Sequence, residues 1–133
     1  MGYTRYWTRT DQPLTEEFVN RVKEIIKESE EKGIKICDGL GVGYPVLNIN
    51  EISFNGDDSI NAAHETCYFT NQGDGWNFCK TERKPYDYTV REVLRVAEEM
   101  GIVTKVRDDG ENEPITDEEW KRHWFKRKYK YGN

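Results

Sequence analysis

Apolar residues recur at three- and four-residue spacing in two stretches of the chain, and this pattern predicts two amphipathic helices. The first helix begins after Thr15, a candidate N-cap, and ends at Gly33. Two acids in its first turn, Glu16 and Glu17, complement the helix dipole. The apolar face consists of Phe18, Val22, Ile25 and Ile26. We therefore expect this helix to cover a core.

The second predicted helix covers residues 89–100 and ends at Gly101. Its apolar face consists of Val90, Val93, Leu94 and Ala97. Two caps compete at its start, because Thr89 matches a capping box with Glu92 and Asp87 lies two residues earlier.

A third helix is expected at about residues 116–131, where Thr116 and Glu119 form another capping box. Trp120 and Trp124 lie one turn apart on it and suggest an interface element. Its six Lys and Arg residues follow an acidic stretch at 108–119. This basic tail binds nucleic acid or an acidic partner surface, or it pairs with those acids, and the net charge of the chain favours pairing.

Short apolar or alternating stretches bounded by turn residues predict strands. They cover residues 3–10, 34–37, 51–55, 64–70, 76–81 and, as an edge strand, 103–106. A turn at 71–75 separates two of them, so we expect 64–70 and 76–81 to pair as an antiparallel hairpin that brings Cys67 and Cys79 together. Cys67 and Phe69 compete with Trp76 and Phe78 for the buried face of this hairpin, and the pattern leaves that choice open.

The order of the elements predicts an α+β fold in a single domain spanning residues 1–133. We expect an antiparallel or mixed sheet of four to five strands, covered by two to three helices.

Composition limits the classes of function that fit. Charged residues make up 34% of the chain and the net charge is −5, which argues against a dedicated nucleic-acid binder. No apolar run reaches the roughly 18 residues of a membrane span. Three cysteines without C-x-x-C spacing exclude the usual zinc and thioredoxin sites. We expect buried thiols, a cytoplasmic location, and no cofactor or metal.

The most informative stretch lies just before the second helix. It carries the cations Lys80, Arg83 and Lys84, which suit a phosphate clamp beside a helix N-terminus. Trp76 and Tyr86 lie close by in sequence and could stack on a nucleotide base. The alternative is a solvated strand end, in which the cations pair with neighbouring acids.

The N-terminal strand places Tyr3, Arg5 and Trp7 on one face. They form either a stacking platform with a cation beside it, or a core face with Arg5 ion-paired. The candidate ligand-binding set is therefore Tyr3, Arg5, Trp76, Lys80, Arg83, Lys84 and Tyr86.

Candidates for catalysis are few, and we assign no catalytic residue. His64 and Glu65 are neighbours on a predicted strand, so their side chains point to opposite faces and do not act together on one atom. The glycines at 39, 41 and 43 lack the spacing of a phosphate-binding loop, and no helix follows them. They form a flexible loop that covers a ligand, contacts another subunit, or is a plain connector.

Three segments of the chain resemble a family of small phage and prophage proteins. These are Gly2–Trp7, His64–Thr66 and Phe78–Asp87. Members of that family begin with a Gly-Tyr-Thr-His-Tyr-Trp-like strand and carry a Cys-Lys-Thr-x-Arg-Lys-Pro-Tyr-Asp block. Arg5 stands where the pattern has His. The resemblance implies a phage origin, and by analogy small phage proteins of this size often counteract host defence.

These observations favour a non-enzymatic phage counter-defence protein in the host cytoplasm. We expect a homo-oligomer that binds and sequesters a phosphorylated small molecule, a cyclic or ADP-ribose-type nucleotide, without turnover. One alternative is a small phosphodiesterase or nucleotide hydrolase that uses His64, Glu65 or Asp87 as acid and base. Another is a protein–protein inhibitor of a host defence factor that acts through the C-terminal helix.

Overall fold

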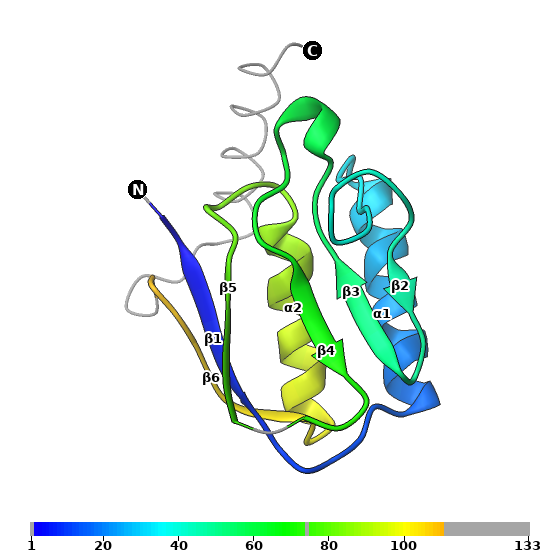
Figure 1. The fold of residues 1–133 in the computed structure, drawn as a ribbon, viewed down its shortest axis with the longest axis vertical. Helices are drawn as coiled ribbons and strands as arrows, with labels where there is room; N and C mark the ends of the chain where they lie inside the picture. Colours follow the sequence, from blue (N-terminus) through cyan, green and yellow to red (C-terminus); the bar gives the residue numbers. More distant parts are fainter. Residues whose placement is uncertain (1, 74, 111–133) are drawn as a thin grey trace.

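The structure is a computed structural model, and it describes residues 2–73 and 75–110 (Figure 1). Over these residues the chain forms two α-helices and six strands, which confirms the predicted α+β fold. The helices are α1 (Glu16–Glu31) and α2 (Asp87–Glu99), and a short 3₁₀ helix covers Asp58–Ile60. The strands are β1 (Thr4–Arg9), β2 (Val46–Leu47), β3 (Glu51–Phe54), β4 (Cys67–Thr70), β5 (Gly75–Lys80) and β6 (Val103–Asp108).

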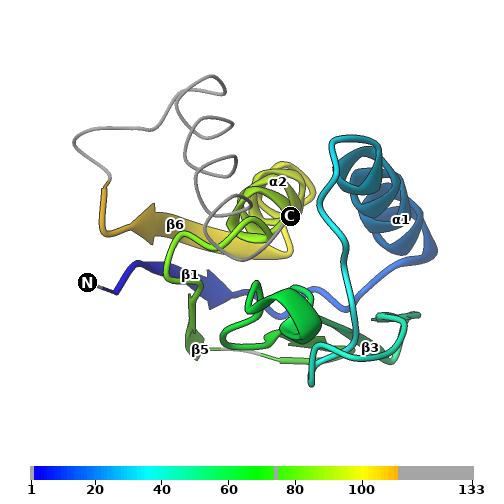
Figure 2. The same ribbon diagram turned by 90° about the horizontal axis from the view of Figure 1, so that it is seen from above.

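The strands form two antiparallel sheets of three rather than one sheet of four to five strands. The first has the order β5-β1-β6 and the second the order β2-β3-β4. Figure 2 shows α1 and α2 side by side over one side of the strands. The predicted edge strand near the end of the described chain is β6, which pairs with β1.

The predicted hairpin of residues 64–70 and 76–81 is wrong. Residues of β4 pair with β3, where Cys67 lies opposite Phe54, and β5 pairs with β1, where Cys79 lies opposite Arg5. The reason is that β1 offers β5 a pairing partner along its whole length. The expected closeness of Cys67 and Cys79 is nevertheless confirmed: both are buried free thiols, and burial together with the neighbouring Cys79 thiol raises the pKa of Cys67.

Side-chain packing joins the two sheets. Phe69 of β4 stacks on Trp7 of β1 with 5.6 Å between ring centroids, and its edge meets Phe18 of α1 at 6.1 Å. All three rings are buried in a continuous core. The apolar pair Cys67 and Phe69 therefore faces inward, and this resolves the choice that the sequence left open.

Helix α1 begins as predicted. The Thr15 hydroxyl accepts a hydrogen bond from the Phe18 N–H at 3.1 Å, and Gly33 follows the helix with a φ of 87°.

Neither candidate cap of α2, Thr89 or Asp87, is found: the helix starts at Asp87, and its N-cap residue Tyr86 makes no side-chain cap bond. The Thr89 hydroxyl instead bonds to the Ser29 hydroxyl of α1 at 2.7 Å, in the buried contact between the helices. The predicted strand at 34–37 reduces to a single bridge between Cys37 and Asn55.

The predicted helix at 116–131 and its basic tail lie outside the described residues. Within those residues, no helix is both long and apolar enough to span a membrane.

Candidate functional site

The segment between β5 and α2 is a tight turn with an uncommon backbone. Glu82 and Arg83 both have left-handed φ angles, 55° and 56°, although neither is glycine. Such conformations cost about 1–3 kcal/mol each and persist only where surrounding contacts enforce them. The backbone N–H groups of Thr81 and Glu82 both donate to the carbonyl oxygen of Tyr3, at 2.9 and 3.1 Å. The turn is therefore anchored to the start of β1.

Arg5 forms an ion pair with Asp87 in the first turn of α2. Its Nε and Nη2 donate to the two carboxylate oxygens of Asp87, each at 2.8 Å. The Thr81 hydroxyl donates to the same carboxylate at 2.6 Å. Burial opposes charge on Arg5, but its bonds to Asp87 outweigh this and raise its pKa above the ordinary value. Both groups are buried, so this is an internal ion pair rather than a ligand site.

The ring of Tyr3 is also occupied. Its hydroxyl donates to Asp108 at 2.6 Å, and the guanidinium of Arg83 lies over its ring, 4.1 Å from the centroid. Burial and the bond to Asp108 raise the pKa of Tyr3 well above its usual range. Tyr3 and Arg83 thus contact each other rather than an open cleft.

Lys84 and Tyr86 face the interior. Lys84 Nζ donates to the backbone oxygen of Asn61 at 2.7 Å and to its side-chain oxygen at 3.3 Å. The Tyr86 hydroxyl donates to the carbonyl oxygen of Glu65 at 2.5 Å, and its ring is fully buried. These contacts hold the turn against the segment that precedes β4.

The structure therefore does not bring Lys80, Arg83 and Lys84 together as the predicted phosphate clamp. The three cations have different partners: Lys80 lies by the Phe78 ring, Arg83 covers Tyr3, and Lys84 bonds Asn61. Four of the seven predicted ligand-binding residues are buried, namely Tyr3, Arg5, Lys84 and Tyr86. Their polar groups fix the turn, and that structural demand explains the dense sequence pattern.

A second arrangement places three rings on the outer side of the β5-β1-β6 sheet, of which two are exposed and Tyr6 is half-buried. Tyr6 pairs with Phe78 across the two strands and Thr8 with Trp76, so these residues share the face opposite to the buried Trp7 and Cys79. Trp76 is 60% exposed and Phe78 is 43% exposed. The ring of Trp76 stacks on the ring of Tyr6 with 5.9 Å between centroids, and its centroid lies 5.2 Å from that of Phe78. We call Tyr6, Trp76 and Phe78 the aromatic face.

Cations border the aromatic face. Lys80 Nζ lies 5.9 Å from the centroid of the Phe78 ring. Arg107 of β6 pairs with Tyr6 in the sheet register and is exposed. Exposed rings with cations beside them can stack a base and attract its phosphate.

Only part of the aromatic face was predicted. Trp76 and Lys80 belong to the predicted set, whereas Tyr6, Phe78 and Arg107 do not. The alternation of Trp76, Phe78 and Lys80 along one strand was the available signal.

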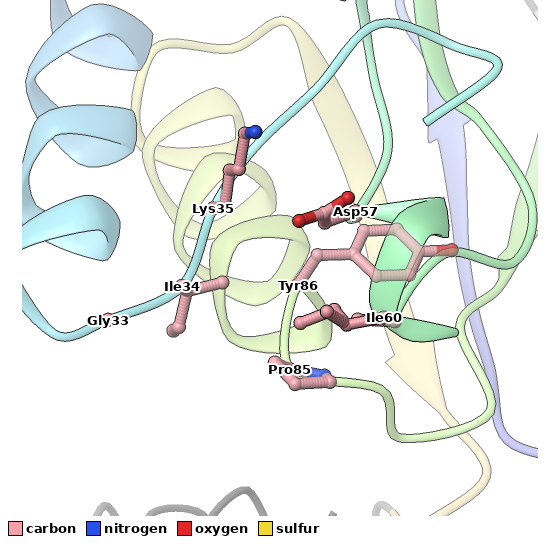
Figure 3. Close-up of a pocket in the computed structure, with 9 residues that line it drawn as sticks. Gly33, Ile34, Lys35, Asp57, Ile60, Pro85 and Tyr86 are labelled. Carbon is pink, nitrogen blue, oxygen red and sulfur yellow. The ribbon is translucent and has the colours of Figure 1, made fainter. Parts of the chain in front are cut away.

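The structure also has a small hollow between the end of α1, the 3₁₀ segment and the start of α2. Its lining includes Lys35, Asp57 and Tyr86 (Figure 3). The hollow is partly open to solvent, and the space inside it that water can reach is only about 10 Å³. Ligand pockets typically measure roughly 300–1,000 Å³, so this hollow is too small to enclose a nucleotide.

The loop before β2 exposes three more apolar side chains. Leu40 is 81% exposed, Val42 70% and Tyr44 93%. We call these three residues the loop ridge. The carboxylate of Asp38 accepts hydrogen bonds from the N–H groups of Leu40 and Val42, at 2.9 and 3.2 Å. Neighbouring turns add further bonds, including Asp58 N–H to the Gly41 oxygen at 3.0 Å. The sequence predicts a flexible loop, and the structure shows one that these bonds hold in place.

The hydrogen bonds to the Asp38 carboxylate predict that the order of this loop depends on pH. The backbone N–H groups lower the pKa of Asp38, the bond from Val42 most of all. A carboxyl group with a lowered folded-state pKa contributes stability above its unfolded pKa and loses it as the pH falls through the folded value. We therefore expect the amides of Leu40 and Val42 to exchange with solvent faster, relative to intrinsic rates, as the carboxylate protonates. Hydrogen exchange by NMR checks this, and the Asp38→Asn variant should show little such change with pH.

The groups considered for catalysis have structural partners. His64 Nδ1 lies 3.0 Å from the Glu82 carboxylate, and the Glu65 carboxylate accepts the Lys80 N–H at 2.8 Å. Asp87 is held by Arg5 and Thr81. Among the residues that the structure describes, no group of three or more His, Cys, Asp or Glu is placed to hold a metal ion.

Comparisons of the chain with protein-family models, with curated proteins and with solved structures found no match.

Proposed function

We propose that this chain is a non-catalytic binding protein that takes a nucleotide-derived ligand on its aromatic face, and that it acts in phage counter-defence by sequestering that ligand. The observation that carries the proposal is the contiguous set of rings Tyr6, Trp76 and Phe78 on one side of a sheet, with Trp76 and Phe78 exposed to solvent. Folded proteins rarely leave such large aromatic side chains together in water unless they bind something.

The chemistry of the face favours a base with a phosphate. A base gains stacking energy on an exposed ring whatever its identity, and Lys80 and Arg107 supply positive charge at the border. We therefore propose that the ligand lies on the outer side of the sheet, away from the turn at 81–87. The partners of His64, Glu65 and Asp87 support binding without turnover.

Binding to the aromatic face is tested with the double variant Trp76→Ser/Phe78→Ser. Each stacked base is worth about 1–3 kcal/mol, so we expect the affinity for ADP-ribose or cyclic di-AMP to fall roughly tenfold or more. Isothermal titration calorimetry measures this, and chromatography of the mixture should return the nucleotide intact. Tyr68→Ser is the matched control, since Tyr68 is an exposed aromatic residue on the other sheet.

Two results would contradict the proposal. One is a double variant that binds both nucleotides as tightly as the native chain. The other is a nucleotide converted to product, with the conversion abolished by His64→Ala, which would favour the hydrolase instead.

A further inference from the structure

Two exposed apolar surfaces lie on different parts of the described structure. The aromatic face belongs to β1 and β5, whereas the loop ridge precedes β2 in the other sheet. Figure 1 shows the loop at 38–45 beside β2 and α1, at the opposite edge of the molecule from β1 and β6. One copy of the chain therefore cannot bring its own ridge onto its own aromatic face.

The two surfaces differ in charge. Two cations, Lys80 and Arg107, border the aromatic face together with one acid, Asp109, whose carboxylate accepts a hydrogen bond from the Tyr6 hydroxyl. Around the ridge the chain is acidic: residues 36–73, which precede β5, contain no Lys or Arg, and Asp38 and Asp58 lie within or against the loop. Surfaces of opposite charge attract each other, and surfaces of like charge repel.

The ridge is also organised in advance. Besides the bonds from Asp38, the Asn55 amide and the Thr66 hydroxyl donate to the Gly39 oxygen at 3.1 and 2.8 Å. Gly41 has a φ of 79°, and a Cβ there would lie 2.9 Å from the Cβ of Asp58. A loop that is already ordered loses little conformational entropy when it docks.

We infer that copies of this chain associate head to tail, with the loop ridge of one copy docked on the aromatic face of the next. Leu40, Val42 and Tyr44 would bury apolar area against the rings, and the acids around the loop would face Lys80 and Arg107. A ridge-to-ridge contact would place acids opposite acids, whereas the ridge meets an excess of cations on the aromatic face. The contact joins two different surfaces, so it generates a closed ring or a growing chain of copies.

This association does not rest on the proposed nucleotide binding, and it is measured without nucleotide. The ridge and a stacked nucleotide would cover the same rings, so a docked neighbour and a bound nucleotide exclude each other.

Two variants that each lack one surface test the contact. Leu40→Ser/Val42→Ser/Tyr44→Ser removes the ridge and keeps the aromatic face. Trp76→Ser/Phe78→Ser removes the face and keeps the ridge. All five positions are exposed, so we expect both variants to fold, which circular dichroism checks. Light scattering coupled to size exclusion should find the native chain larger than a monomer, each variant alone monomeric, and their mixture a dimer.

A charge exchange adds a control on the direction of the contact. We expect Lys80→Glu/Arg107→Glu to weaken association with a copy that keeps its ridge, and Asp58→Lys in that copy to restore it. The exposed pair Lys23→Ser/Lys27→Ser on α1 should change nothing. The inference is overturned if the native chain stays monomeric at high concentration, if a single-surface variant still self-associates, or if the two variants do not combine.

Discussion

Asp87→Ala is expected to destabilise the protein by about 3–5 kcal/mol, because it leaves the buried guanidinium of Arg5 without its carboxylate partner. The Thr81 hydroxyl loses its acceptor in the same change. Chemical denaturation followed by circular dichroism measures the effect as a fall in the midpoint. Because ordinary domains are stable by only about 5–15 kcal/mol, a loss of this size removes a large part of the free energy of unfolding.

The same pair yields an internal control. Arg5→Ala/Asp87→Ala should cost much less than the sum of the two single variants, because no unpaired charge remains inside. Glu24→Ala removes one partner of an exposed ion pair on α1 and should change stability by no more than about 0.5 kcal/mol. A near-neutral Asp87→Ala with loss of nucleotide binding would show instead that Arg5 serves a ligand.

Phe69→Ala is expected to lower the free energy of unfolding by about 3–5 kcal/mol, as much as Asp87→Ala. Phe69 is buried between Trp7 of the other sheet and Phe18 of α1, so its removal leaves a cavity where the two sheets meet. The two sheets share no strand pairing, so the contacts of the Phe69 ring contribute much of the packing that joins them. Denaturant titration measures the loss.

Tyr68→Ala is the matched control for this packing. Tyr68 is the neighbour of Phe69 in β4 and points to solvent, so its removal should change stability by no more than about 0.5 kcal/mol. Equal losses for the two variants would contradict the assignment of Cys67 and Phe69 to the buried face of β4.

Local patterns along the chain were sufficient to predict most of the elements. The apolar spacing of α1, its Thr15 cap and the glycine after it are all properties of neighbouring residues, and the structure confirms them. Strand pairing was harder to predict from the sequence, because it depends on which distant segments of the chain come together. The short turn at 71–75 favoured a hairpin, but β1 is the partner that accommodates β5 over its full length.

The candidate site shows a second limit of the sequence. A run of Lys, Arg, Tyr and Asp before a helix has the composition of a phosphate site, and the same residue types also build a buried polar network. Here Arg5 satisfies Asp87 and Lys84 satisfies the oxygens of Asn61. Composition does not distinguish these outcomes, because the difference lies in which side chains reach water. The exposure of Trp76 and Phe78 could be judged only once the buried side of each strand was known.

An NMR titration of the ¹⁵N-labelled protein with ADP-ribose distinguishes a ligand on the aromatic face from a ligand at the turn of residues 81–87. If the aromatic face binds the nucleotide and the turn is structural, the largest shifts will occur at the Trp76 indole N–H and at the backbone amides of Tyr6, Phe78 and Lys80, with smaller changes at residues 81–87. Shifts concentrated at Arg83 and Lys84, with the Trp76 indole unmoved, would contradict binding at the aromatic face and return the ligand to the turn.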